Sequence, residues 1–483
     1  MFFNSIDFAL FLPIVFILYW FVTNKYLVAQ NLLIVVASYV FYGWWDWRFL
    51  FLILFSTCVD FIIGLKLGEE PNNKKRKILL WISICVNIGL LGVFKYYNFF
   101  LDNFVIAFSF FGKELSVDSL NIILPVGISF YTFQTLSYTI DVYRRNLEPT
   151  KNIVAFTAFV SFFPQLVAGP IERATNLLPQ FYKKRKFEYN LAVDGSKQIL
   201  WGFFKKIVIA DNCSLYVNDI FTNYVDYSGL TLVIAAILFA FQIYCDFSGY
   251  SDIAIGFSRL FGFDLMQNFA FPYFSRDIAE FWRRWHISLS TWFRDYVYIP
   301  LGGNRGSIYK KVRNVMIIFI VSGFWHGANW TFIIWGALNA LYFIPLLLLN
   351  RNRKNIEVVA KNKTFPKLKD MAFIIGTFGL TTFAWIFFRA ENLEQAISFI
   401  NHMISNFSFK TEILDIRKGN GFYMLVIAFI IFITTEWLNR DKKHGLEELK
   451  KIPKFIQWVF YYILISLMIM FDVSNVDFIY FQF

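Results

Sequence analysis

The chain has 483 residues, of which 57% are hydrophobic and 17% are charged. A soluble globular domain carries about a quarter of charged residues, so this composition excludes an ordinary soluble protein. The 21% aromatic content excludes a disordered or low-complexity chain. The net charge is +12, and the basic residues lie in short clusters between apolar runs, which is typical of a membrane protein. We therefore expect the protein to be surrounded by membrane lipid rather than to bind nucleic acid.

Apolar runs occur along the whole chain, and a helix needs roughly 20 apolar residues to cross a membrane. We predict an all-α polytopic membrane protein with about eleven transmembrane helices. The first run has no basic stretch before it and no cleavage site after it, so it is expected to remain as a helix. The clearest runs are Phe8–Thr23, Leu32–Trp45, Phe49–Leu65, Ile78–Phe94, Leu120–Ile140, Ile153–Pro170, Gly229–Cys245, Val315–Trp325, Trp330–Leu349, Ala372–Phe388, Phe422–Trp437 and Phe455–Phe471.

The charge of the connecting segments predicts the orientation of the helices. Basic loops should face the cytoplasm, whereas the neutral, acidic or mixed connections and both termini should face outward. We expect one integral domain in the plasma or inner membrane, with N-terminal helices at 1–145, a core at 146–350 and C-terminal helices at 351–483. The basic clusters are residues 74–77, 144–145, 183–186, 305–313, 351–369 and 440–454.

The middle third of the chain does not divide simply into spans. Lys197–Asp211 is predicted to be a basic amphipathic helix that anchors along the membrane interface. Ser275–Arg313 is too charged to cross lipid and too aromatic for a free loop, so it should fold back against the membrane core from the cytoplasmic side.

Two carboxylates flank an expected turn at Ser248–Ser251. Asp252 is predicted to cap a helix, whereas Asp246 is a candidate for orienting a histidine or binding a cation. Asn329, just after the second glycine near His326, is a further orienting or structural candidate.

His326 is the first candidate catalytic residue. The apolar run before it is roughly 16 Å long as a helix, too short to cross alone, so His326 should lie near mid-membrane and be enclosed by protein. Gly323 and Gly327 would allow close approach of a neighbouring helix or a substrate. A buried neutral imidazole can accept a proton from an attacking hydroxyl, although the spacing leaves a structural histidine equally open.

His286 opens a block rich in Arg and Trp. Arg283, Arg284 and Arg294, with Trp285 beside them, could hold a phosphorylated or nucleotide-bearing donor through bidentate hydrogen bonds and stacking. Composition alone favours the alternative, a belt of Arg and Trp that faces lipid headgroups.

The remaining polar features give weaker signals. The glycine-rich turn Gly302–Gly306 could bind an anion. His402 and His444 stand in polar connections, where an exposed histidine is expected to have no specific role. The four cysteines are far apart without a framework spacing, so neither disulfides nor a metal site is expected.

The two histidine segments, in this order and spacing, resemble the membrane-bound O-acyltransferase family, in particular its bacterial alginate O-acetylase branch. The segments are Arg283–Tyr296, Ile299–Arg305 and Gly323–Gly327. The resemblance covers nearly the whole chain, with supporting segments at Leu124–Phe130, Phe163–Gln165, Gly169–Arg173, Tyr244–Asp252, Trp385–Arg389 and Phe478–Phe483.

The resemblance implies re-entrant or interfacial helices around a central tunnel that brings a cytoplasmic acyl donor to an acceptor on the other side. It implies that His326 is the catalytic histidine and that His286 is the second histidine of the site. The donor would be a thioester such as acetyl-CoA, used as substrate, with no bound cofactor. The acceptor would be a hydroxyl of an exported polysaccharide, or of an extracellular or periplasmic partner protein, an esterase-like transferase. Because the sequence shows no soluble sugar-binding domain, the partner transferase is the favoured acceptor.

Two alternatives remain open. One is the D-alanyl transferase branch of the family, which acts on teichoic acid from a carrier-protein thioester. The stretch Ile299–Arg305 and the added C-terminal helices favour the acetylase branch. The other is a lipid or polysaccharide transporter without covalent chemistry, which would explain the helices but not His326 beside Gly327.

Overall fold

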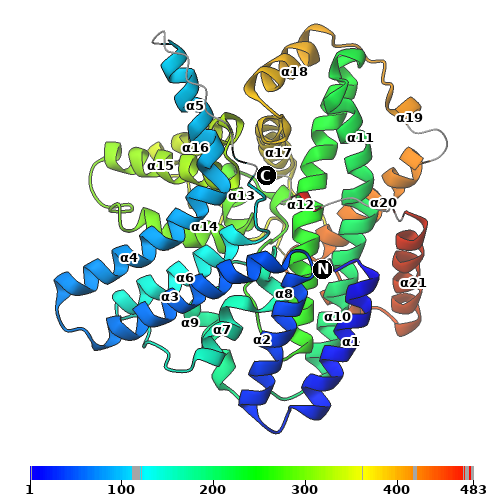
Figure 1. The fold of residues 1–483 in the computed structure, drawn as a ribbon. Coiled ribbons are helices and arrows are strands. Elements are labelled where there is room, and N and C mark those ends of the chain that lie inside the picture. The colour runs from blue at the N-terminus through cyan, green and yellow to red at the C-terminus, as the bar shows by residue number, and fades with distance from the viewer. Residues whose placement is uncertain are drawn as a thin grey trace. The chain divides into compact units, whose positions relative to one another are not determined.

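A computed structural model describes residues 1, 3–110, 120, 122–361, 363–416, 421–471, 473 and 478–479 (Figure 1). Every regular element within these ranges is a helix, as the sequence predicts. The chain folds into two compact units. The first comprises Met1–Gly195 with Phe257–Met266, and the second comprises Ser196–Gly256 with Gln267–Phe483.

Six helices in the described part of the chain are long and apolar enough to cross a membrane, and three more are apolar but shorter. The prediction of about eleven spanning helices is therefore not confirmed. Some apolar runs are not continuous helices, because the run from Ile153 is interrupted at Phe162 and the run from Leu120 becomes helical only at Ile128. The six are Trp47–Glu69, Asn73–Phe110, Gly229–Leu260, Trp330–Leu348, Leu368–Arg389 and Gly421–Leu438; the shorter three are Ile6–Val22, Leu27–Gly43 and Lys454–Met470.

In the first unit, α3, α4 and α6 pack together, and α2 packs on α7 and α8 (Figure 1). Asp60 on α3 is fully buried and accepts hydrogen bonds from Ser83 and Asn87 on α4 and from Thr139 on α6. One satisfied carboxylate thus links three helices. The helices are α1 (Ile6–Ile17), α2 (Leu27–Gly43), α3 (Leu50–Glu69), α4 (Asn73–Leu91), α5 (Tyr97–Phe110), α6 (Ile128–Tyr143), α7 (Ile153–Ser161), α8 (Phe163–Leu166) and α9 (Ala174–Leu177).

The second unit contains the histidine segments, and its most extensive helix pair is α15 with α16. Two helices are shared, since α10 begins in the first unit and α12 ends in it. The helices are α10 (Tyr189–Phe203), α11 (Asp211–Thr222), α12 (Gly229–Leu260), α13 (Ile278–Arg284), α14 (Ile287–Phe293), α15 (Ile308–His326), α16 (Trp330–Leu348), α17 (Leu368–Arg389), α18 (Leu393–Ser405), α19 (Ile413–Ile416), α20 (Gly421–Leu438) and α21 (Lys454–Met470).

The predicted interfacial anchor is wrong. The segment Lys197–Asp211 runs from α10 through a π-helical stretch, Phe204–Ala210, into α11, and Lys205 and Lys206 within it are buried. The Lys206 Nζ atom lies 2.8 Å from an Asp211 carboxylate oxygen and 2.9 Å from an Asp246 oxygen. These charges face acidic partners inside the protein, so they are not available to lipid headgroups.

The predicted turn at Ser248–Ser251 is also wrong. Helix α12 continues through it for 32 residues, and Asp252 lies inside the helix rather than at its cap. The Lys205 Nζ atom lies 2.6 Å from an Asp252 carboxylate oxygen and donates to Ser248 Oγ at 2.9 Å. Neutralisation by the two buried lysines allows the carboxylates to remain in the middle of a long helix.

Candidate active site

His326 is the last residue of α15 and is 5% exposed. The helix has 19 residues, more than the apolar run alone, because it already begins at Ile308, in the polar segment before that run. A Cβ atom at Gly323 would collide with the Phe332 carbonyl oxygen, and one at Gly327 would collide with the Phe332 ring. The close neighbour that these glycines admit is therefore helix α16.

Aromatic rings surround the His326 imidazole. Its centroid lies 4.9 Å from that of Trp325, 5.2 Å from Trp335 and 5.3 Å from Phe388. Trp335 stacks in turn on Trp385 at 5.4 Å. This cage excludes bulk water, which strengthens electrostatic interactions at the ring nitrogens.

His286 is held differently. It precedes α14 in a left-handed conformation, with φ 42° and ψ 56°, and it is 1% exposed. Its Nδ1 atom lies 3.0 Å from Asn268 Oδ1. A non-glycine residue in this region is strained, and such strain persists only where the surroundings hold it.

One tryptophan connects the two histidines within the second unit. The ring centroid of Trp325 lies 4.9 Å from that of His326 and 6.2 Å from that of His286. Phe247 on α12 packs edge-on against His286 at 4.6 Å. Burial lowers the pKa of the His286 imidazole to about 3, so this ring is neutral at physiological pH. The predicted pair of histidines thus meets in one dry aromatic cluster.

Two of the predicted donor-binding residues lie in the protein interior. Arg284 donates to Glu280 at 3.0 Å and to the Ala270 carbonyl oxygen at 3.1 Å. Trp285 is 1% exposed and packs against rings that include Trp385, at 5.0 Å. Both residues therefore anchor the end of α13 in the protein interior. That Arg284 or Trp285 contacts the acyl donor stays a prediction.

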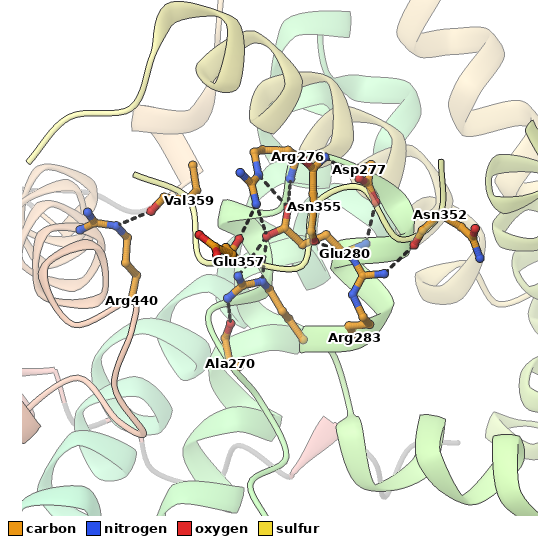
Figure 2. Close-up of polar contacts among 11 residues, drawn as sticks. Ala270, Arg276, Asp277, Glu280, Arg283, Asn352, Asn355, Glu357, Val359 and Arg440 are labelled. Carbon is orange, nitrogen blue, oxygen red and sulfur yellow. Dashed lines mark hydrogen bonds and ion pairs between the residues drawn. The ribbon is translucent and has the colours of Figure 1, made fainter. Parts of the chain in front are cut away.

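Arg283 holds the loop that follows α16. Figure 2 shows its guanidinium donating to the carbonyl oxygens of Asn352 and Asn355, at 2.8 Å and 2.7 Å. The Asn355 side chain donates to Asp277, the N-cap of α13, at 2.7 Å. Farther along, Arg440 donates to the Val359 carbonyl oxygen at 2.9 Å. Side chains of the second unit therefore fix the path of this loop across α13.

A cavity of about 330 Å³ lies among α13, α14, α15, α16 and this loop. Arg283, Arg294 and Arg353 line it, and no acidic side chain of the described residues does, although Asp295, outside the lining, pairs with Arg294 at 2.7 Å. The other lining residues are mostly apolar, with Phe319 and Phe343 among them. A cationic and apolar cavity of this size fits a ligand with an anionic end and a narrow neutral arm. Arg353 is the residue that sequence reasoning missed, because no spacing indicates that its loop folds back onto α13.

The cavity follows one face of α15. Val315, Phe319 and Ser322 line it at intervals of four and three residues, and His326 continues this spacing four residues later. The same helix face that lines the cavity therefore leads to the candidate catalytic histidine.

Comparison with known proteins agrees with this site. The family model described as membrane-bound O-acyltransferase matches residues 144–366, which include both histidines and the lining of the cavity. A protein named probable alginate O-acetylase AlgI, from Pseudomonas aeruginosa, is 39% identical over 89% of this chain and 80% of its own length. The chain belongs to the membrane-bound O-acyltransferase family. It is therefore a multi-pass membrane enzyme, an O-acyltransferase.

Two further relatives are named for other acceptors, peptidoglycan and teichoic acid. The peptidoglycan O-acetyltransferase of Helicobacter pylori is 36% identical over 82% of this chain and 78% of its own length. The teichoic acid D-alanyltransferase of Streptococcus thermophilus is 31% identical, but over 48% of this chain and 59% of its own length. The acetylases thus match a larger part of this O-acyltransferase.

The orienting candidates of the acyltransferase have structural partners. Asp246 pairs with Lys206 and accepts the Ile479 backbone N–H at 2.7 Å. The Phe478 ring, one residue earlier, packs 6.2 Å from Phe247, which contacts His286. The remaining residues of the motif Phe478–Phe483 lie outside the described residues.

Asn329 caps the N-terminus of α16, since its side chain accepts the Thr331 N–H at 3.0 Å and donates to the Glu391 carbonyl oxygen at 2.7 Å.

The expectation that His444 is exposed is wrong, because it is 1% exposed. Its Nδ1 accepts the Leu446 backbone N–H at 3.3 Å within a tight turn. His402, partly exposed, lies 3.2 Å from the Tyr227 carbonyl oxygen.

Proposed function

We propose that this O-acyltransferase moves an acetyl group from acetyl-CoA, supplied from the cytoplasm, to a hydroxyl on the other side of the membrane. The acceptor hydroxyl belongs to an extracellular or periplasmic partner transferase, which passes the group to an exported polysaccharide. The likeness to the alginate and peptidoglycan acetylases over most of the chain supports the acetyl group and the polysaccharide.

The observation that carries the proposal is the cavity beside α15. Arg283, Arg294 and Arg353 give it a positive lining suited to the phosphates of coenzyme A. Its apolar part accommodates the neutral pantetheine arm, which is long and narrow, along the face of α15 that ends at His326. The thioester is thus directed toward the aromatic cage.

His326 acts as the general base in this mechanism. A ring nitrogen takes the proton of the acceptor hydroxyl while the oxygen bonds to the thioester carbonyl carbon. The carbon–sulfur bond then breaks, and the imidazolium returns the proton to the leaving thiolate. The products are an ester and a free thiol, with no net exchange of protons with the solvent.

His286 supplies the second ring at the site. Because its imidazole is neutral, its unprotonated nitrogen can accept the hydrogen bond of the acceptor hydroxyl as the acceptor enters and orient the oxygen toward the carbonyl carbon, before the hydroxyl turns its single proton to His326. Trp325, between the two rings, limits the space through which the acceptor approaches.

The test is transfer of label from radioactive acetyl-CoA by the purified protein in liposomes, with the partner transferase or the polysaccharide present in turn. Label should appear on the partner, and the His326→Ala variant should insert normally but transfer label more slowly by a factor on the order of 10² to 10⁴. Label on the polysaccharide without the partner would overturn the relay. Transfer of D-alanine from a charged carrier protein, with no use of acetyl-CoA, would overturn the acetyl group.

The proposed orientation has its own test. The basic loop near Lys361 should face the cytoplasm and the C-terminus should face outward. A reporter inserted near Lys361 and one fused after Phe483 should therefore report opposite sides. Both reporters on one side would overturn the orientation.

A further inference from the structure

Asn268 contacts three successive residues at the start of α14. Its backbone carbonyl oxygen accepts the Ile287 N–H at 2.8 Å. Its side-chain Oδ1 lies 3.0 Å from His286 Nδ1 and accepts Ser288 Oγ–H at 2.9 Å. Asn268 itself is fully buried, and its Nδ2 donates to Ser251 Oγ on α12 at 3.0 Å.

These contacts determine which way the amide points. The Ser288 backbone N–H also points at Oδ1, at 3.4 Å, and a backbone N–H can only donate. The atom facing it must therefore be the acceptor oxygen rather than the NH₂ group. The NH₂ group then faces Ser251 Oγ, which can accept.

The amide orientation in turn determines the tautomer of His286. An oxygen that only accepts requires a donor at Nδ1, so the imidazole proton lies on Nδ1 and the lone pair lies on Nε2. The Nε2 atom is buried and has no hydrogen-bond partner among the described residues. It is the one ring nitrogen of His286 that is left for a substrate.

We propose that Asn268 is the positioning residue of the active site: it holds His286 as the Nδ1–H tautomer and presents the Nε2 lone pair to the acceptor hydroxyl. This inference rests on the role given to His286 in the proposed function. Two backbone hydrogen bonds hold the left-handed conformation of His286. The Asn268 carbonyl oxygen accepts the Ile287 N–H, and the Ala270 N–H donates to the Arg284 carbonyl oxygen. Backbone and side chain of one segment therefore fix both the place and the protonation of the ring.

The kinetic test compares two substitutions of similar shape. Asn268→Leu removes the acceptor, so kcat should fall by about 10- to 100-fold because the wrong tautomer becomes accessible, while the KM for acetyl-CoA stays within about twofold. Asn268→Asp keeps an acceptor at Nδ1 and should restore most of kcat. Asn212→Leu is the matched control, since Asn212 is equally buried but donates to backbone carbonyls. All rates are taken per folded enzyme in liposomes.

A spectroscopic test reads the tautomer directly. In protein labelled with ¹⁵N-histidine, the His286 signals, assigned by their loss in His286→Ala, should show a protonated Nδ1 and an unprotonated Nε2. The same signals in Asn268→Leu should show a mixture of tautomers. A protonated Nε2 in the unsubstituted protein would overturn the inference, as would a full kcat for Asn268→Leu.

The two proposals fail in different ways. A fully active His286→Ala variant would overturn the role of His286 in the proposed function, whatever the nitrogen shifts show. An inactive His286→Ala variant combined with unaltered Asn268→Leu kinetics would overturn the positioning role alone.

Discussion

His326 ends a 19-residue helix inside a cage of rings, whereas His286 precedes a seven-residue helix and is held by an amide. The position of His326 depends on helix packing, since Gly323 and Gly327 let α16 approach. The position of His286 depends on hydrogen bonds that its segment donates to Asn268, which lies 18 residues away in the sequence. Packing against neighbouring rings constrains where an imidazole lies, whereas a directed acceptor such as Asn268 Oδ1 also determines the tautomer of the imidazole that it contacts.

The largest effect is expected at His326. His326→Ala should lower acetyl transfer by a factor on the order of 10² to 10⁴, the usual contribution of a positioned general base. Transfer rates in liposomes at matched protein content provide the measurement, with His402→Ala as a histidine control outside the aromatic cage. Near-normal transfer by His326→Ala would make His326 a structural residue of the cage.

The packing that places His326 is tested at Gly323. Gly323→Ala forces a methyl group against the Phe332 backbone, so we expect a loss of about 1–3 kcal/mol in stability and a clear loss of activity. Gly376→Ala is the control: it also adds a methyl group within a helix, but its Cβ would meet no atom within 4 Å. Thermal unfolding in detergent and transfer rates should separate the two. Equal behaviour of both variants would show that α15 and α16 can separate without cost.

The cavity arginines are expected to affect donor binding rather than the chemical step. Arg294→Lys and Arg353→Lys keep the charge but lose the planar guanidinium, so each should raise the KM for acetyl-CoA by about 3- to 10-fold and leave kcat nearly unchanged. Added salt should weaken donor binding further. Arg313→Lys, an exposed arginine on α15 outside the cavity lining, should leave the KM unaltered. An unaltered KM in both cavity variants would remove them from the donor site.

The smallest effect concerns stability against pH. The unfolded chain protonates His286 near its ordinary pKa of 6.5, whereas the folded chain keeps it neutral down to about pH 3. The unfolded state therefore binds more protons between these values, and folding stability should fall as the pH is lowered, by at most about 1.4 kcal/mol per pH unit. His286→Asn should reduce this slope in unfolding measurements between pH 7 and 5. A slope that is the same in both proteins would mean that the native ring takes up a proton in this range.

The sequence by itself determined the all-α membrane class, the family and the two histidine segments. Apolar runs and the spacing around His326 and His286 depend on residues that are close together in the chain, so they can be read without tertiary contacts. The same local rules overestimated the continuity of some helices, because the break at Phe162 leaves the hydropathy of its run unchanged.

Only the tertiary structure decided how buried polar groups find their partners. Lys206 looks like an interfacial charge until Asp246, from another helix, is placed beside it. Arg353 reaches the cavity because Arg283 binds the carbonyl oxygens of its loop, and Asn268 reaches His286 across a chain reversal. A hydrogen bond or an ion pair needs distance and direction between segments that are remote in sequence, and those are set by the fold.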